Sequence, residues 1–103
     1  MKIVRLKLDY LAGPIWKNYY DPVLKRKITG VPIIDNDQFL GHMNYDTEQL
    51  YSQLYSFDDG VCTFDSEGYE GIKGYLKSNV EKIIKYLDKI NDGSFTVVDE
   101  IKW

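Results

Sequence analysis

The sequence predicts one domain of the α+β class, in which helices cover a small mixed or antiparallel sheet that includes the first and last strands. Three patterns indicate this class: alternating apolar and charged residues near the N-terminus, a long run of apolar residues at helical spacing, and a β-prone segment at the end. With 103 residues, of which 44% are hydrophobic, the chain is long enough to bury one core and too short for two. We therefore treat residues 1–103 as a single globular domain.

The first third of the chain favours extended structure. Apolar residues alternate with charged ones over residues 2–10, which is the period of a strand with one buried face. The aromatic segment 15–20 is β-prone and is followed by a turn dipeptide, Asp21–Pro22, so that a hairpin or an irregular excursion is expected. Residues 27–35 form a second strand or a loop, since the glycine and the proline within them confine a strand to a sheet edge.

A shorter helix is predicted over about residues 47–57. Asp46 is a suitable cap for it, and Gln49 stands three residues later, as in a capping box. Apolar residues at positions 50, 54 and 57 recur at helical spacing and should face the core. The segment 60–65 is short and β-prone, which favours a strand.

The strongest local pattern predicts an amphipathic helix over about residues 72–91. Apolar residues recur there at steps of three or four, and most of the lysines fall elsewhere on the helix. The start of this helix stays open, because each glycine in residues 68–74 costs up to about 1 kcal/mol in a helix interior, while Ser78 with Glu81 offers another capping box. Residues 94–103 read as a closing strand, which we expect to pair near the first strand.

Charge is distributed unevenly along the chain. The net charge is −3, with 13 basic and 16 acidic residues, yet no Lys or Arg occurs between Lys27 and Lys73. This base-free span holds nine of the acids and is rich in tyrosine and phenylalanine. Carboxylates that repel one another gain nothing for folding alone, and tyrosine suits protein interfaces. The span predicts an acidic, Tyr-containing surface for a basic protein; the alternative is that the acids are dispersed and serve solubility.

Ten residues of the base-free span are the candidate partner contacts. We expect the acids to pair with bases of the partner and the tyrosines to supply packed contact area. The ten are Asp35, Asp37, Asp46, Glu48, Tyr51, Tyr55, Asp58, Asp59, Asp65 and Glu67.

Few residues suit catalysis or metal binding. His42 is the one histidine, and Cys62, the one cysteine, is expected to be a small buried side chain. Asp35 and Asp37 are possible ligands of a hard cation, but their spacing departs from the EF-hand loop. The sequence therefore predicts a protein that is not an enzyme and holds no metal or cofactor.

The expected location is the cytoplasm. The N-terminal residues have no apolar run like that of a signal peptide, and no segment has the roughly 20 apolar residues that a membrane helix needs. The negative net charge argues against direct binding to nucleic acid or to an anionic membrane, because both depend on cationic surface.

These features resemble those of bacterial immunity proteins. A single-domain, acidic, cysteine-poor chain rich in Asp and Tyr is similar to the proteins that neutralise nuclease toxins in colicin and contact-dependent growth inhibition systems. Residues 44–57, NYDTEQLYSQLYSF, are similar to the inhibitory helix region of the barstar family. The resemblance implies tight one-to-one inhibition of a cognate, basic nuclease toxin domain without catalysis.

Three other functions stay open at this point. One is a nucleic-acid mimic whose carboxylates imitate phosphates and block a DNA-binding protein. Another is a small metal-dependent module or enzyme built on Asp35, Asp37 and His42. The last is a structural or interaction domain, such as a homo-oligomer, with no inhibitor role.

Overall fold

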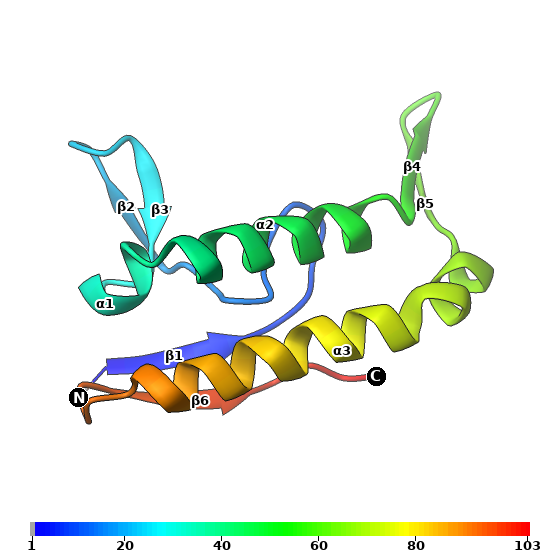
Figure 1. Ribbon diagram of the computed structural model, residues 1–103. Coiled ribbons are helices and arrows are strands. Elements are labelled where there is room, and N and C mark those ends of the chain that lie inside the picture. The colour runs from blue at the N-terminus through cyan, green and yellow to red at the C-terminus, as the bar shows by residue number, and fades with distance from the viewer. Residues whose placement is uncertain (1) are drawn as a thin grey trace.

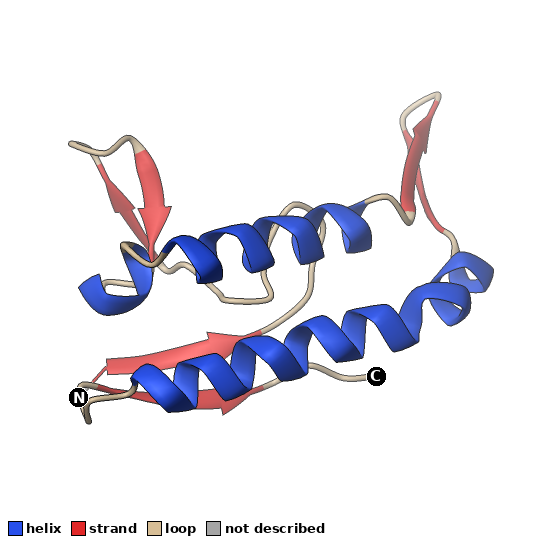
Figure 2. Ribbon diagram, in the orientation of Figure 1, coloured by secondary structure: helices blue, strands red, loops and turns tan. Residues whose placement is uncertain are grey.

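The computed structural model describes residues 2–103 and confirms the α+β class (Figure 1). The two terminal strands lie side by side, α3 runs along them, and α2 packs against α3 (Figure 2). The strands are β1 (Lys2–Leu6), β2 (Tyr19–Asp21), β3 (Arg26–Ile28), β4 (Tyr55–Asp58), β5 (Val61–Phe64) and β6 (Phe95–Asp99), and the helices are α1 (Pro32–Asp35), α2 (Gln38–Ser52) and α3 (Ser66–Ile90).

The first and last strands pair, as predicted, and they do so in parallel. Lys2 lies opposite Phe95, and Leu6 lies opposite Asp99. The β2–β3 and β4–β5 hairpins are antiparallel, so the described chain has three separate two-stranded sheets. β1 ends at Leu6, earlier than the predicted strand, because the chain then folds back and the Lys7 amide donates to the carbonyl oxygen of Pro14 at 2.8 Å.

The hydrophobic core lies between the β1–β6 pair and the two long helices. The predicted apolar face of α3 supplies Ile83 and Leu87, which are fully buried. Burial of each such side chain stabilises the fold by roughly 1.5–3 kcal/mol. The buried residues of this cluster are Val4, Leu6, Ile15, Val31, Ile34, Leu40, Ile83, Leu87 and Phe95.

The long helix α3 starts at Ser66, earlier than the predicted position near residue 72. Asp65 caps the helix, because its carboxylate accepts a hydrogen bond from the Gly68 amide at 2.9 Å. A Cβ at Gly68 would collide with this carboxylate, whereas one at Gly71 or Gly74 would meet no atom within 4 Å. The first glycine therefore makes room for the cap, and the cap offsets part of the helix propensity that the glycines lose.

The prediction of a helix over residues 47–57 is wrong at both ends. The helix α2 spans Gln38–Ser52, and Asp37 caps it in place of Asp46, with its carboxylate accepting from the Leu40 amide at 2.9 Å. The last residues of the predicted helix belong to β4. An exposed N-terminal turn needs an acceptor for its free amides, and Asp37 provides one well before the predicted start.

Candidate protein-binding surface

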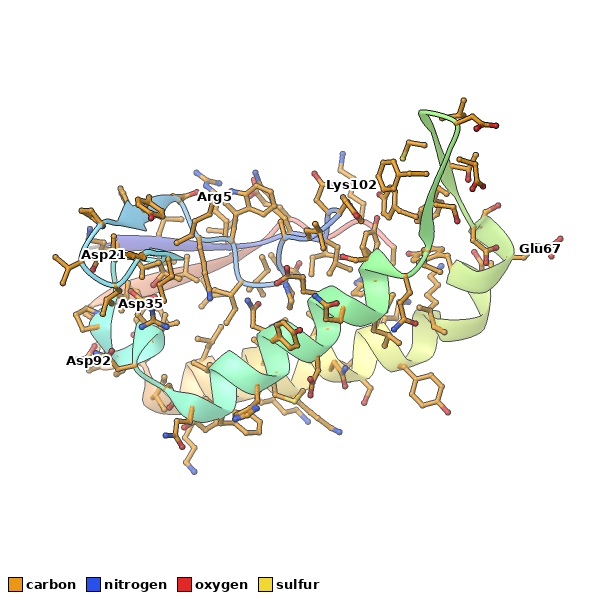
Figure 3. All side chains as sticks on the ribbon, turned by 90° about the horizontal axis from the view of Figure 1, so that it is seen from above. Arg5, Asp21, Asp35, Glu67, Asp92 and Lys102 are labelled. Carbon is orange, nitrogen blue, oxygen red and sulfur yellow. The ribbon has the colours of Figure 1, made fainter. Side chains whose placement is uncertain are left out.

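The ten candidate residues are spread over the molecule. Asp35 and Glu67 lie at opposite ends in Figure 3, and the longest dimension of the chain is 44 Å. Asp35 is the last residue of α1 and Asp37 caps α2. Asp46 and Glu48 lie in the middle of α2, and the other six lie at or near the β4–β5 hairpin. Each group has a different local role.

The first group holds the fold together. The Asp35 carboxylate accepts hydrogen bonds from the amide and hydroxyl of Thr29 at 2.8 and 2.7 Å and from the Gly30 amide at 3.0 Å. Asp37, besides capping α2, accepts from the hydroxyl of Tyr86 at 2.6 Å. This hydrogen bond raises the pKa of Tyr86 above its usual value, with smaller contributions from desolvation and from the Asp37 charge. Both carboxylates are therefore engaged within the protein.

The two acids of the middle group have different surroundings. Asp46 is exposed on α2. Glu48 is half-buried, and burial raises its pKa, although the positive charge of Lys17 opposes this rise. Glu48 therefore faces a base that is distant in sequence, whereas Asp46 projects into solvent.

The third group gathers at the tip and base of the β4–β5 hairpin, which projects away from the helices (Figure 1). Its acids are accompanied by large apolar side chains, because Phe57, Val61 and Phe64 are 54%, 59% and 41% exposed. We call this set the acidic hairpin surface. It consists of Phe57, Asp58, Asp59, Val61, Phe64, Asp65 and Glu67, all of which are exposed.

An aromatic cluster supports the acidic hairpin surface from below. The hairpin is fixed to the helices and to the loop after β1 by ring contacts with centroids 5.1–6.1 Å apart. Tyr51 and Tyr55 belong to this cluster and are half-buried, with their hydroxyls 3.3 Å apart. The members are Tyr10, Tyr51, Tyr55, Phe57, Phe64 and Tyr69. The two candidate tyrosines therefore hold the hairpin against the helices and do not form an exposed contact surface.

The environment of Tyr51 disfavours its ionised form. Burial is the largest cause and raises the pKa of Tyr51 well above its usual value. The hydrogen bond with Tyr55 raises it further, as do the nearby Asp9 and Tyr69. Tyr51 therefore stays neutral at physiological pH and acts as a packing and hydrogen-bonding group.

The acids of the base-free span have no salt-bridge partner among residues 2–103. The ion pairs found there join Arg5 and Lys7 to Glu100, with N–O distances of 3.1 and 3.8 Å. The lysines of α3 therefore do not neutralise the acidic hairpin surface by direct contact. Its negative charge is available to another molecule.

The sequence did not predict the exposed apolar residues of this surface. Phe57 was expected to face the core from a helix, yet it lies on β4 and is exposed. Cys62 was expected to be buried, but it is exposed on β5, which pairs only with β4. The sequence did contain a relevant signal, Asp59–Gly60 between two β-prone segments, which is a strong hairpin pattern.

No group of three or more His, Cys, Asp or Glu side chains among residues 2–103 is arranged to hold a metal ion. Within this range, no helix combines the length and apolar character needed to cross a membrane. Comparison of the chain with protein-family models, curated proteins and solved structures gives no match.

Proposed function

We propose that this chain is an immunity-type protein that binds and neutralises a basic nuclease toxin domain through the acidic hairpin surface. The observation that carries the proposal is the combination of exposed Phe57, Val61 and Phe64 with carboxylates that have no basic partner in the described chain. The cytoplasm of the cell that must be protected is the corresponding location.

The apolar side chains of the hairpin favour a protein partner. Single exposed apolar residues are common on soluble proteins, whereas a group on one projecting element is typical of an interface. Phe57 and Phe64 belong to the aromatic cluster and contact rings outside the hairpin, so the hairpin is already held in place before binding. A rigid contact element loses less conformational entropy on association.

The carboxylates favour a basic partner. Asp58, which shares a face of the hairpin with Val61, and Asp59 lie at the tip, and Asp65 and Glu67 lie at the base, so that a negative rim borders the hairpin at both ends. Such a rim attracts a cationic surface over long range and pairs with Arg or Lys after water is excluded. A nucleic-acid mimic fits less well, since the acids of the base-free span fall into three groups instead of one continuous row.

The test is co-expression of this chain with candidate nuclease toxin domains, beginning with any that the neighbouring reading frames encode. Cell survival reports neutralisation, and calorimetry with the purified, inactivated toxin domain reports affinity. The test variant combines Asp58→Lys with Asp59→Asn, because Asp59 has a positive φ of 50° that asparagine tolerates better than lysine. The control is Glu81→Lys, which changes an exposed acid on α3.

The expected result is protection by the native chain and by the control variant. The test variant should bind at least about tenfold more weakly, with a smaller salt dependence, because charge reversal at an interface removes attraction and adds repulsion. Equal affinity and equal salt dependence for the test variant would exclude the acidic hairpin surface as the site. Absence of both binding and protection with the native chain would contradict the immunity function itself.

A further inference from the structure

A second surface has the opposite charge. A cleft of about 550 Å³ lies between the loop after β1, the β2–β3 hairpin and α2. The residues that matter for its chemistry are Trp16, Lys17, Tyr20, Arg26, Asn44 and Glu48. Its volume falls within the roughly 300–1,000 Å³ of typical small-molecule sites. None of these residues belongs to the acidic hairpin surface, and the proposed function gives them no role.

The most buried polar side chain that lines the cleft is that of Asn44. This residue is only 4% exposed, and its Oδ1 accepts a hydrogen bond from the Ile15 amide at 2.7 Å. That bond fixes the orientation of the side chain, so that Nδ2 points the other way. Among residues 2–103, Nδ2 has no hydrogen-bond acceptor. No fully enclosed side-chain nitrogen or oxygen in this range lacks a partner, so Nδ2 is not fully enclosed. Nδ2 is therefore a donor without a partner in the described chain, on a residue that lines the cleft.

Basic residues surround this donor. Lys17, Arg26 and Lys27 line the cleft, against Glu48 as the one acid in the lining. Arg26 uses one guanidinium nitrogen to donate to the carbonyl oxygen of Asp35 at 3.2 Å, which holds the group in place and leaves its other N–H groups for a ligand. The cleft thus offers net positive charge and fixed donors, the features that favour an anion.

Aromatic rings form the walls of the cleft. Trp16, Tyr19 and Tyr20 line it. Lys7 Nζ lies 5.1 Å from the centroid of the Trp16 ring, and Lys2 Nζ lies 4.9 Å from that of Tyr19, so cation–π contacts help to hold both rings. Aromatic walls of this kind stack against planar rings.

We propose that this cleft binds a small anion that carries a planar ring, of the nucleoside monophosphate class. Lys17 and Arg26 pair with the anionic group, and the Asn44 amide donates a hydrogen bond to the ligand. The ring packs against Trp16 and Tyr20. This proposal is independent of the inhibitor function, because it uses different residues and a different ligand.

The experiment is a titration of the ¹⁵N-labelled chain with adenosine monophosphate, followed by NMR. The reporters are the indole N–H of Trp16 and the side-chain amide of Asn44, and parallel titrations use adenosine and inorganic phosphate. We expect saturable shifts of both reporters, with adenosine monophosphate binding at least about tenfold more tightly than either fragment, because both halves of the ligand are recognised.

Two variants make the test specific. Lys17→Met removes one charge at the cleft, and Asn44→Asp keeps an acceptor for the Ile15 amide while replacing the free donor with a negative charge. Each should weaken binding by about tenfold or more, since a charge-assisted contact is lost. The control, Lys82→Met, removes an exposed lysine of α3 and should bind as the native chain does.

Several outcomes would overturn the proposal. Absence of reporter shifts at millimolar adenosine monophosphate would exclude the site, and equal binding of inorganic phosphate would exclude recognition of the ring. Equal effects of Lys17→Met and Lys82→Met would show general charge attraction without a site. Circular dichroism checks the fold of Asn44→Asp, and Lys17→Met alone decides the question where that variant is unfolded.

Discussion

Replacement of Asp35 by alanine should destabilise the fold, although the sequence favours this residue as a partner contact. Its carboxylate accepts three hydrogen bonds from Thr29 and Gly30, and Thr29 is buried. Hydrogen bonds to a charged group contribute about 1.5–3 kcal/mol each, and the partial exposure of Asp35 reduces this value. We expect Asp35→Ala to lower the free energy of unfolding by about 2–4 kcal/mol, a large share of the roughly 5–15 kcal/mol of a typical domain.

Urea unfolding followed by circular dichroism measures this loss. Asp35→Asn should be intermediate, because one amide oxygen still accepts from Thr29 while the NH₂ group faces the Gly30 amide donor. The matched control is Asp58→Ala, whose carboxylate is exposed and should change stability by less than about 0.5 kcal/mol. An Asp35→Ala variant as stable as this control would refute the assignment of Asp35 to the fold.

Four further substitutions test other parts of the structure. Gly13→Ala should lower the free energy of unfolding by at least about 1–2 kcal/mol in the same urea assay, because Gly13 has a φ of 82° and a Cβ there would collide with a backbone carbonyl oxygen. Gly71→Ala and Gly74→Ala should each raise it by up to about 1 kcal/mol, and a loss would contradict a helix at these positions. Tyr51 should ionise later than an ordinary tyrosine in an absorbance titration at 295 nm, and Tyr51→Phe should reduce the late component, to which Tyr86 also contributes. Because its folded-state pKa is raised, its contribution to stability is complete below the unfolded pKa of about 10 and is lost as pH rises towards the folded value.

The sequence predicted α3 better than α2 for a reason visible in their buried faces. The buried face of α3 is apolar, with Leu76, Val80 and Ile83 among its members, so the apolar spacing follows the helix. The buried face of α2 includes Asn44 and Thr47, whose Oδ1 accepts from the Ile15 amide and whose hydroxyl donates to a carbonyl oxygen of the preceding turn, respectively. A partner 29 residues away cannot be read from local spacing.

The strand β5 was predicted within residues 60–65, but β4 and the hairpin that the two strands form were missed, because two local patterns conflict there. Helical spacing joins Leu54 to Phe57, but only Leu54 is buried. The competing pattern is the turn pair Asp59–Gly60, in which both residues have positive φ, at 50° and 79°. These values fit the tight turn that an Asp-Gly pair favours between antiparallel strands. The preference of Asp59–Gly60 for a tight turn therefore outweighed the helical spacing of Leu54 and Phe57, and the segment forms a hairpin.

The uneven distribution of charge is visible in the sequence, but the separation of the acids into three groups on the folded molecule is not. Asp and Glu serve several local purposes that have nothing to do with a partner. Asp35 holds a turn, and Asp37 and Asp65 cap helices. A count of acids along the chain gives each of these the same weight as a free carboxylate, so it overestimates the charge that is free to bind.

The same reasoning singles out one acid of the acidic hairpin surface. Asp59 suits the turn, Asp65 caps α3, and Glu67 in the first helical turn complements the helix dipole. Asp58 has none of these roles, since it is exposed on β4 opposite Val61. Asp58→Ala should therefore weaken toxin binding without changing stability, whereas Asp65→Ala should lower the free energy of unfolding by about 1 kcal/mol through loss of the cap. A stability loss at Asp58 would place it with the structural acids and remove the residue that most directly supports a binding role.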